Sequence, residues 1–289
     1  MRFVFINYGW LAMISIREAQ QFALQALTAS DSASSDVQLL LCHVLQCQAV
    51  RLLSAPEQLL SEAQWAAFSQ LVERRQHGEP VAYLTGQRGF WSLDLQVNNS
   101  TLIPRPDTEL LVELALSRLQ ANMTVVDLGT GTGAIALALA TERRDITLLA
   151  TDYSFAALTL AKQNAQANHI TGVQFVHTSW LDAFQPRSMD FIISNPPYIA
   201  ADDPHIQQGD LRFEPLSALV AERDGLADLQ QIVKQARECL KPNGWLLVEH
   251  GYQQSQQVQQ LFADAGFTQI KAYQDLGRQD RAVMGQLTL

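Results

Sequence analysis

The tetrapeptide Asn195-Pro196-Pro197-Tyr198 follows an apolar run, Phe191–Ser194, that has the composition of a buried strand. Two consecutive prolines cannot continue a sheet, so a rigid turn is expected directly after this strand. The side-chain oxygen of Asn195 and the carbonyl of Pro196 are two acceptors suited to one NH2 group. Tyr198 adds a flat face for a planar amide or base. The tetrapeptide therefore predicts a site that holds a planar amine for methyl transfer.

A glycine-rich segment, Gly129-Thr130-Gly131-Thr132-Gly133, follows the apolar run Val125–Leu128 and precedes a helical pattern. Glycines let the backbone approach a ligand closely, and the N–H groups at a helix start can bind its polar atoms. Asp152, about twenty residues further on, ends the next strand, where a carboxylate can accept both hydroxyls of a ribose. Two local alternatives stay open. The glycines could form a tight turn without a ligand, and Asp152 could cap the next helix, a role that Ser154 could equally fill.

These residues are expected to be positioned by strands that alternate with helices. Because the alternation persists, it predicts a parallel, doubly wound sheet. No helix separates the last two strands, so they should form an antiparallel hairpin, which distinguishes a methyltransferase-type sheet from an all-parallel dinucleotide-binding one. The expected strands are 124–128, 147–151, 173–176, 190–194, 245–249, 268–273 and 281–287, with helices from 134 and 154 and over 226–240 and 254–265.

The region before residue 104 has a different organisation. Residues 13–82 repeat apolar positions at helical spacing and predict a bundle of four or five helices whose helical pattern ends at Glu79-Pro80. We expect this domain to recognise the substrate. Residues 83–103 alternate like strands and predict a β-hairpin linker. Residues 104–289 then form the expected catalytic domain. Residues 1–12 are interpreted as an N-terminal extension.

Composition narrows the class of protein. The chain has 289 residues, 47% of them hydrophobic and 17% charged, which is typical of a globular protein rather than a disordered one or a membrane bundle. Its formal net charge of −9 argues against broad attraction to nucleic acid. Cys42, Cys47 and Cys239 form no CxxC pair, so we interpret them as buried thiols in a reducing compartment and expect no metal site.

Together the motifs identify the chain as similar to a known family. It resembles the bacterial protein-(glutamine-N5) methyltransferases that modify peptide chain release factors, from Met13 to the end. The tetrapeptide also occurs in methyltransferases of DNA adenine and ribosomal RNA. The run Ile103–Glu109 is what makes the resemblance specific. That run could line the pocket or simply start a helix, with Pro106 near its first position and Asp107 or Thr108 as cap. The matching segments are Leu102–Glu109, Gly129–Gly133, Asn195–Tyr198, Phe213–Pro215 and Asp224–Leu226.

The resemblance implies a class I S-adenosylmethionine-dependent methyltransferase fold, with a Rossmann-like seven-stranded sheet behind a small helical bundle. It further implies that Asn195, Pro196, Pro197 and Tyr198 hold the substrate glutamine. The residues that it implies for contact with S-adenosylmethionine are Gly129, Thr130, Gly131, Thr132, Gly133, Asp152, Trp180 and Asn195.

Two points at the adenine end of the cofactor site stay open. Trp180 could instead be an aromatic residue buried under a loop. The family often has an acidic residue directly before this tryptophan, whereas this chain has Ser179. The adenine amino group could therefore be held by Ser179 or Asp182, or more weakly than in the family.

The activity implied is methyl transfer to the glutamine of the Gly-Gly-Gln loop of class I release factors, which supports translation termination. From the family we expect a cytoplasmic monomer with no stable binding to nucleic acid or membranes. An amide nitrogen needs alignment and acceptors rather than a strong base. Three alternatives are glutamine methylation of a ribosomal protein, methylation of an exocyclic amine in DNA or RNA, and a binding module with a vestigial cofactor pocket; acidic charge disfavours the nucleic-acid reading.

Overall fold

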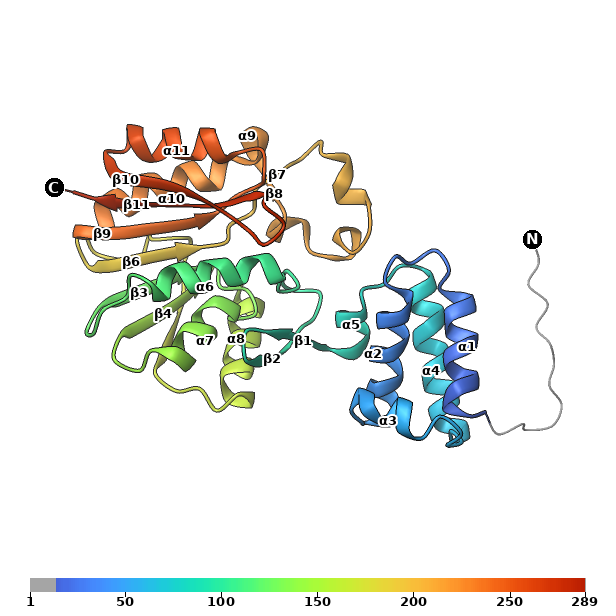
Figure 1. The fold of residues 1–289 in the computed structure, drawn as a ribbon. Helices are drawn as coiled ribbons and strands as arrows, with labels where there is room; N and C mark the ends of the chain where they lie inside the picture. The colour runs from blue at the N-terminus through green and yellow to red at the C-terminus, as the bar shows by residue number, and fades with distance from the viewer. Residues whose placement is uncertain (1–13, 289) are drawn as a thin grey trace. The chain divides into compact units, whose positions relative to one another are not determined.

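The computed structural model describes residues 14–288, and these form two compact units that divide between Thr85 and Gly86 (Figure 1). The extension expected over residues 1–12 lies outside the described residues. No helix within residues 14–288 is both long and apolar enough to cross a membrane.

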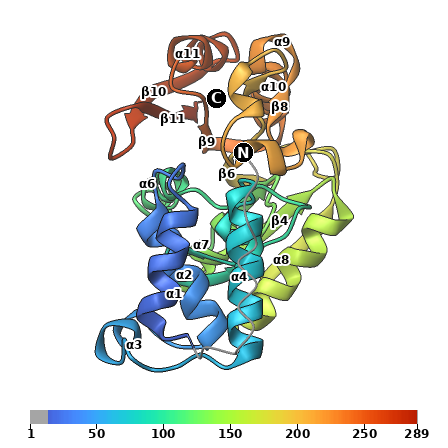
Figure 2. The same ribbon diagram turned by 90° about the vertical axis from the view of Figure 1, so that its right-hand side faces the viewer.

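The N-terminal unit is a helical bundle in which α1, α2 and α4 pack together (Figure 2). Ser15 and Ser61 begin α1 and α4 with capping boxes, so both helix starts follow from local sequence. The expectation that the helices end at Glu79-Pro80 was wrong. One more short helix follows, in which the Pro80 carbonyl accepts the N–H of Leu84. The helices are α1 Ile16–Ala26, α2 Ala33–Leu45, α3 Ala49–Ser54, α4 Glu62–Gln76 and α5 Val81–Thr85.

The second unit opens with an antiparallel hairpin of β1 Gln87–Phe90 and β2 Leu93–Gln96. Its main sheet has seven strands in the order β10-β11-β9-β6-β3-β4-β5, and β11 runs antiparallel to both of its neighbours. This confirms the predicted class of fold, including the terminal hairpin. The strands are β3 Thr124–Leu128, β4 Thr147–Asp152, β5 Val173–His177, β6 Met189–Ser194, β9 Leu240–Glu249, β10 Phe267–Gln274 and β11 Asp280–Leu287.

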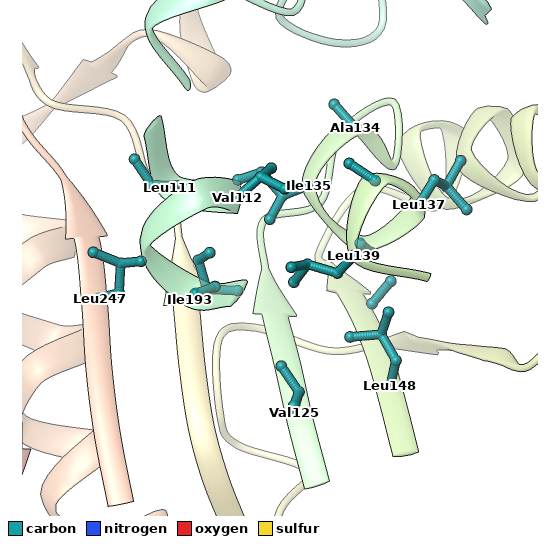
Figure 3. Packing of buried hydrophobic residues seen from close by; sticks show 14 of the residues in the cluster. Leu111, Val112, Val125, Ala134, Ile135, Leu137, Leu139, Leu148, Ile193 and Leu247 are labelled. Atoms are coloured by element: carbon teal, nitrogen blue, oxygen red, sulfur yellow. The ribbon is translucent and has the colours of Figure 1, made fainter. Parts of the chain in front are cut away.

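Helices cover both faces of this sheet. On one face, side chains of α6 and α7 meet Val125, Ile193 and Leu247 of three adjacent strands (Figure 3). Val126 and Ile192 are the sequence neighbours of Val125 and Ile193, and they pack with α10 and α11 on the other face. Alternate residues of the buried strands therefore supply two cores. The helices are α6 Glu109–Leu116, α7 Ala134–Glu142, α8 Phe155–Ala167, α9 Glu222–Gly225, α10 Ala227–Cys239 and α11 Ser255–Asp264.

One strand begins earlier than its sequence predicts. Residues 245–249 were the expected strand, but β9 begins at Leu240, which pairs with Met189. The pairing register shifts before Phe191 pairs with Trp245, so the Pro-Asn-Gly stretch from Pro242 lies within an irregular strand.

The chain crosses the carboxyl edge of the sheet between β6 and α9. Here β7 Ile199–Ala200 pairs with β8 Val220–Ala221. Three 3-10 turns fill the intervening segment: η2 Pro204–Gln207, η3 Leu211–Phe213 and η4 Leu216–Ala218. A fourth, η1 Pro106–Thr108, directly precedes α6. All of these surround the edge at which parallel sheets bind ligands.

Candidate active site

The glycine loop is a tight turn held by buried polar groups. Gly129 has φ +66°, and a Cβ at this position would stand 3.2 Å from the ring of Trp180. Asp127, at the end of β3, accepts hydrogen bonds from the Thr130 hydroxyl at 2.6 Å and the Ala136 N–H at 3.2 Å. Burial raises the pKa of Asp127 to about 7. Gly129 is therefore required both by backbone conformation and by the close approach of an aromatic ring.

Asp152 ends β4 beside this loop and is 7% exposed. One carboxylate oxygen accepts the Gly131 N–H at 3.0 Å, and the other accepts the Ser154 N–H at 2.8 Å. The cap of α8 is the Ser154 side chain, which bonds the N–H of Ala157. Asp152 thus leaves the capping role to Ser154 and instead ties the glycine loop to β4. Burial raises its pKa.

Trp180 forms the far wall of the site. Its ring lies over Gly129, and its indole interacts with the carboxylate of Asp228 at the start of α10. Ser179 lines the same cavity, whereas the Asp182 carboxylate lies outside the lining and accepts a hydrogen bond from Gln235 at 2.6 Å. Of the two residues considered for the adenine end, the structure brings only Ser179 to the cavity, and it adds Asp228.

A cavity of about 480 Å³ opens at the carboxyl edge of the sheet. This volume is within the range of small-molecule and cofactor sites. Its walls combine the loop, the Asp152 carboxylate, an aromatic ring and part of the tetrapeptide, a donor and acceptor set that fits a nucleoside. The predicted site residues in the lining are Gly129, Thr130, Gly131, Thr132, Asp152, Ser179, Trp180, Asn195 and Pro197.

Three predicted residues lie behind this lining. Gly133, with φ +87°, starts α7 and faces Leu137, so its role here is helix packing. Pro196 is buried behind the cavity wall. Tyr198 is half-buried and packs in the core beneath α10 and α11, and its hydroxyl donates to a carboxylate rather than facing the cavity.

The tetrapeptide is held by a chain of hydrogen bonds. Asn195 Nδ2 donates to the Thr108 hydroxyl at 3.1 Å, and this hydroxyl donates to Glu249 Oε2 at 2.8 Å. The Tyr198 hydroxyl donates to Glu249 Oε1 at 3.1 Å. Pro106 does begin the 3-10 turn, but Thr108 makes no side-chain cap and lines the cavity instead.

Burial raises the pKa of Glu249 to about 7, although hydrogen bonds from Thr108 and Tyr198 oppose the shift. Sequence reasoning missed Glu249 and Asp228. Glu249 had one local signal, a charged residue that ends an apolar strand at the same edge as Asn195. Asp228 had no comparable signal, because an acidic residue in the first turn of a helix is ordinary.

A buried ion pair between Arg105 and Glu214 borders the cavity. Arg105 lines the cavity and bonds Glu214, whose side chain is fully buried. Burial raises the pKa of Glu214 to about 7 against the opposing effect of Arg105. The pair joins the segment before α6 to the segment between β7 and β8, two of the regions whose motifs define the resemblance.

Two sequence families match this chain. Residues 18–86 match the family described as PrmC N-terminal domain, and residues 106–209 match the family described as methyltransferase small domain. Among solved structures, a methyltransferase from Pyrococcus furiosus superposes with a TM-score of 0.54 at 15% identity, covering 76% of this chain and 100% of that one. At this identity the likeness supports the fold alone.

Curated relatives match over nearly their whole length. A protein of Aliivibrio fischeri named release factor glutamine methyltransferase is 47% identical, over 94% of this chain and 98% of its own. A protein of Yersinia pestis with the same name is 48% identical, over 97% of this chain and 99% of its own.

Proposed function

This chain belongs to the release factor glutamine methyltransferase family, and from that premise we propose that it methylates the side-chain amide nitrogen of a glutamine in peptide chain release factors. The methyl donor in this proposal is S-adenosylmethionine. The observation that carries the proposal is the orientation of Asn195. Its Nδ2 is bonded to Thr108, so the acceptor end of its amide, Oδ1, is the one left for a substrate in the cavity.

The cavity residues fit the cofactor. Gly129 lets the backbone lie against the Trp180 ring without a side chain between them. Asp152 offers carboxylate lone pairs for ribose hydroxyls in addition to its bonds to the glycine loop. Trp180, Ser179 and Asp228 would surround the adenine. When bound, S-adenosylmethionine supplies an electrophilic methyl group on a sulfonium centre.

The protein's part in the reaction is alignment. Oδ1 of Asn195, which lines the cavity, accepts a hydrogen bond from the glutamine NH2 group, which directs the nitrogen lone pair at the methyl carbon. As the N–C bond forms and the C–S bond breaks, positive charge develops on nitrogen and strengthens this hydrogen bond. The nitrogen then loses one proton to solvent, which leaves N5-methylglutamine and S-adenosylhomocysteine.

Methyl-labelled S-adenosylmethionine tests the proposal when it is incubated with the protein and four separate acceptors: a bacterial class I release factor, ribosomal protein, DNA and RNA. We expect label in the release factor alone, with the mass of one methyl group on one glutamine-containing peptide. Label confined to ribosomal protein or to nucleic acid would support one of the alternative acceptors and reject the release factor.

A further inference from the structure

Glu249 lies behind the tetrapeptide and is joined to it in two ways, directly at Tyr198 and through Thr108 at Asn195. The residue is 1% exposed, and both oxygens of its carboxylate are engaged, Oε2 by Thr108 and Oε1 by Tyr198. The sheet places it there. Ser194 of β6 pairs with Val248 of β9, so Asn195 and Glu249 are the next residues at the same carboxyl edge.

Proton positions along this chain of bonds are constrained. A hydroxyl carries one hydrogen, and Thr108 gives it to Glu249. The Thr108 oxygen can then act toward Asn195 only as an acceptor. Asn195 must present its NH2 group to Thr108 at 3.1 Å, and its carbonyl oxygen points the other way. Within residues 14–288, that oxygen makes no hydrogen bond.

We propose that Glu249, acting through Thr108, is a positioning residue that fixes which end of the Asn195 amide faces the substrate. This inference rests on the proposed function and deepens it. An ionised Glu249 can only accept, so it holds the Asn195 oxygen toward the glutamine NH2 group. A protonated Glu249 donates to Thr108, whose hydrogen then turns to Asn195. That arrangement stabilises the flipped amide, which offers the substrate a donor where it needs an acceptor.

The charges around Glu249 set the pH at which this change occurs. Arg281 of β11 favours the ionised form, whereas Asp107 of η1 and burial favour the neutral form. Tyr198 stays protonated because burial and the nearby Glu249 raise its pKa. Since the pKa of Glu249 is about 7, the fraction with the productive amide orientation rises with pH through neutrality.

Substitution of Thr108 tests the relay directly. Thr108→Val keeps the side-chain shape and removes the hydroxyl, whereas Thr108→Ser keeps the hydroxyl. We expect Thr108→Val to lower the single-turnover rate of release factor methylation by about 10- to 100-fold, the scale of a misplaced catalytic group. Cofactor affinity and the KM for the release factor should stay near wild type, and Thr108→Ser should restore most of the rate. Thr141→Val is the matched control, because within residues 14–288 its hydroxyl bonds only the Ala138 carbonyl of α7.

The pH profile supplies a readout that a purely structural role would not change. In wild type and Thr141→Val, the single-turnover rate should rise between pH 6 and 8, a window around the pKa of Glu249 of about 7. Glu249→Gln cannot ionise, so we expect that rise to disappear while calorimetry still shows cofactor binding.

Three results would overturn the inference. One is a Thr108→Val enzyme with the wild-type rate, and another is a Glu249→Gln enzyme that keeps the rise between about pH 6 and 8 expected for this carboxyl. The third is a loss of cofactor affinity in Thr108→Val as large as its loss of rate, which would make Thr108 a binding residue. A wild-type protein that methylates no release factor would instead reject the proposed function, and this inference with it.

Discussion

The carboxylate of Asp152 accepts the backbone N–H of Gly131 at 3.0 Å. This bond joins the end of β4 to the loop that follows β3, and both strands run parallel and adjacent in the sheet. The same carboxylate lines the cavity, so one buried side chain both shapes the glycine loop and faces the ligand.

Substitution of Asp152 should therefore weaken cofactor binding more than it weakens folding. We expect Asp152→Ala to reduce the free energy of S-adenosylmethionine binding by about 1.5–3 kcal/mol for each charged hydrogen bond lost, partly offset by water. Asp182→Ala is the matched control, because that carboxylate lies outside the cavity lining and bonds Gln235. Calorimetry that finds wild-type affinity in Asp152→Ala would limit Asp152 to holding the loop.

A pair of glycine substitutions separates backbone strain from steric exclusion. Gly129 and Gly172 both have positive φ, but a Cβ at Gly172 would meet nothing within 4 Å. Alanine at either position should cost roughly 1–2 kcal/mol of stability for the left-handed conformation. Only Gly129→Ala should also lose cofactor affinity, because its Cβ would press on Trp180. Equal cofactor affinity in the two variants would argue against the close approach of Trp180.

Glu214 should make folding stability depend on pH. Its pKa is raised from 4.5 in the unfolded chain to about 7 when folded, so the folded state holds the extra proton between these values. The free energy of unfolding should therefore fall as pH rises from 5 to 7.5, with roughly 1–3 kcal/mol due to this group. Glu214→Gln, which can still accept from Arg105, should show a shallower fall in urea unfolding. An unchanged slope would contradict the raised pKa.

The N-terminal helical unit is proposed to bind the body of the release factor while the cavity takes its glutamine. A separate domain adds binding energy that a small cavity cannot supply. Deletion of residues 1–85, which ends at the boundary between the units, should greatly reduce methylation of an intact release factor and leave cofactor affinity near wild type. Full activity of a truncated protein that still binds the cofactor would refute this role.

Much of the fold could be predicted from local signals. The strand Thr124–Leu128 was predicted at its observed bounds. A short apolar run between a polar turn and a glycine loop is typical of a buried strand. The early start of β9 could not be predicted, because Pro242 and Gly244 are turn residues locally and are accommodated only by an irregular pairing with β6.

The candidate site also contains some residues that could be predicted from the sequence and others that could not. The glycine loop and the tetrapeptide could be predicted because each carries its chemistry within a few adjacent residues. Glu249 and Asp228 could not, because their roles depend on partners distant in sequence, Thr108 for one and Trp180 for the other. The placement of Tyr198 also depends on tertiary structure. Its ring was expected to face the substrate, whereas the hydroxyl is drawn to Glu249.

The central claim is that Asn195 accepts a hydrogen bond from the reacting nitrogen, and single-turnover methylation of a release factor at saturating cofactor tests it most directly. We predict that Asn195→Ala lowers this rate by about 10²–10³, as removal of one preorganised hydrogen-bonding group does elsewhere. Asn195→Asp should recover part of the rate, because it keeps an acceptor but adds a charge. Cofactor binding is measured separately, since Asn195 lines the same cavity. A wild-type single-turnover rate in Asn195→Ala would contradict the claim and leave the tetrapeptide as a structural turn.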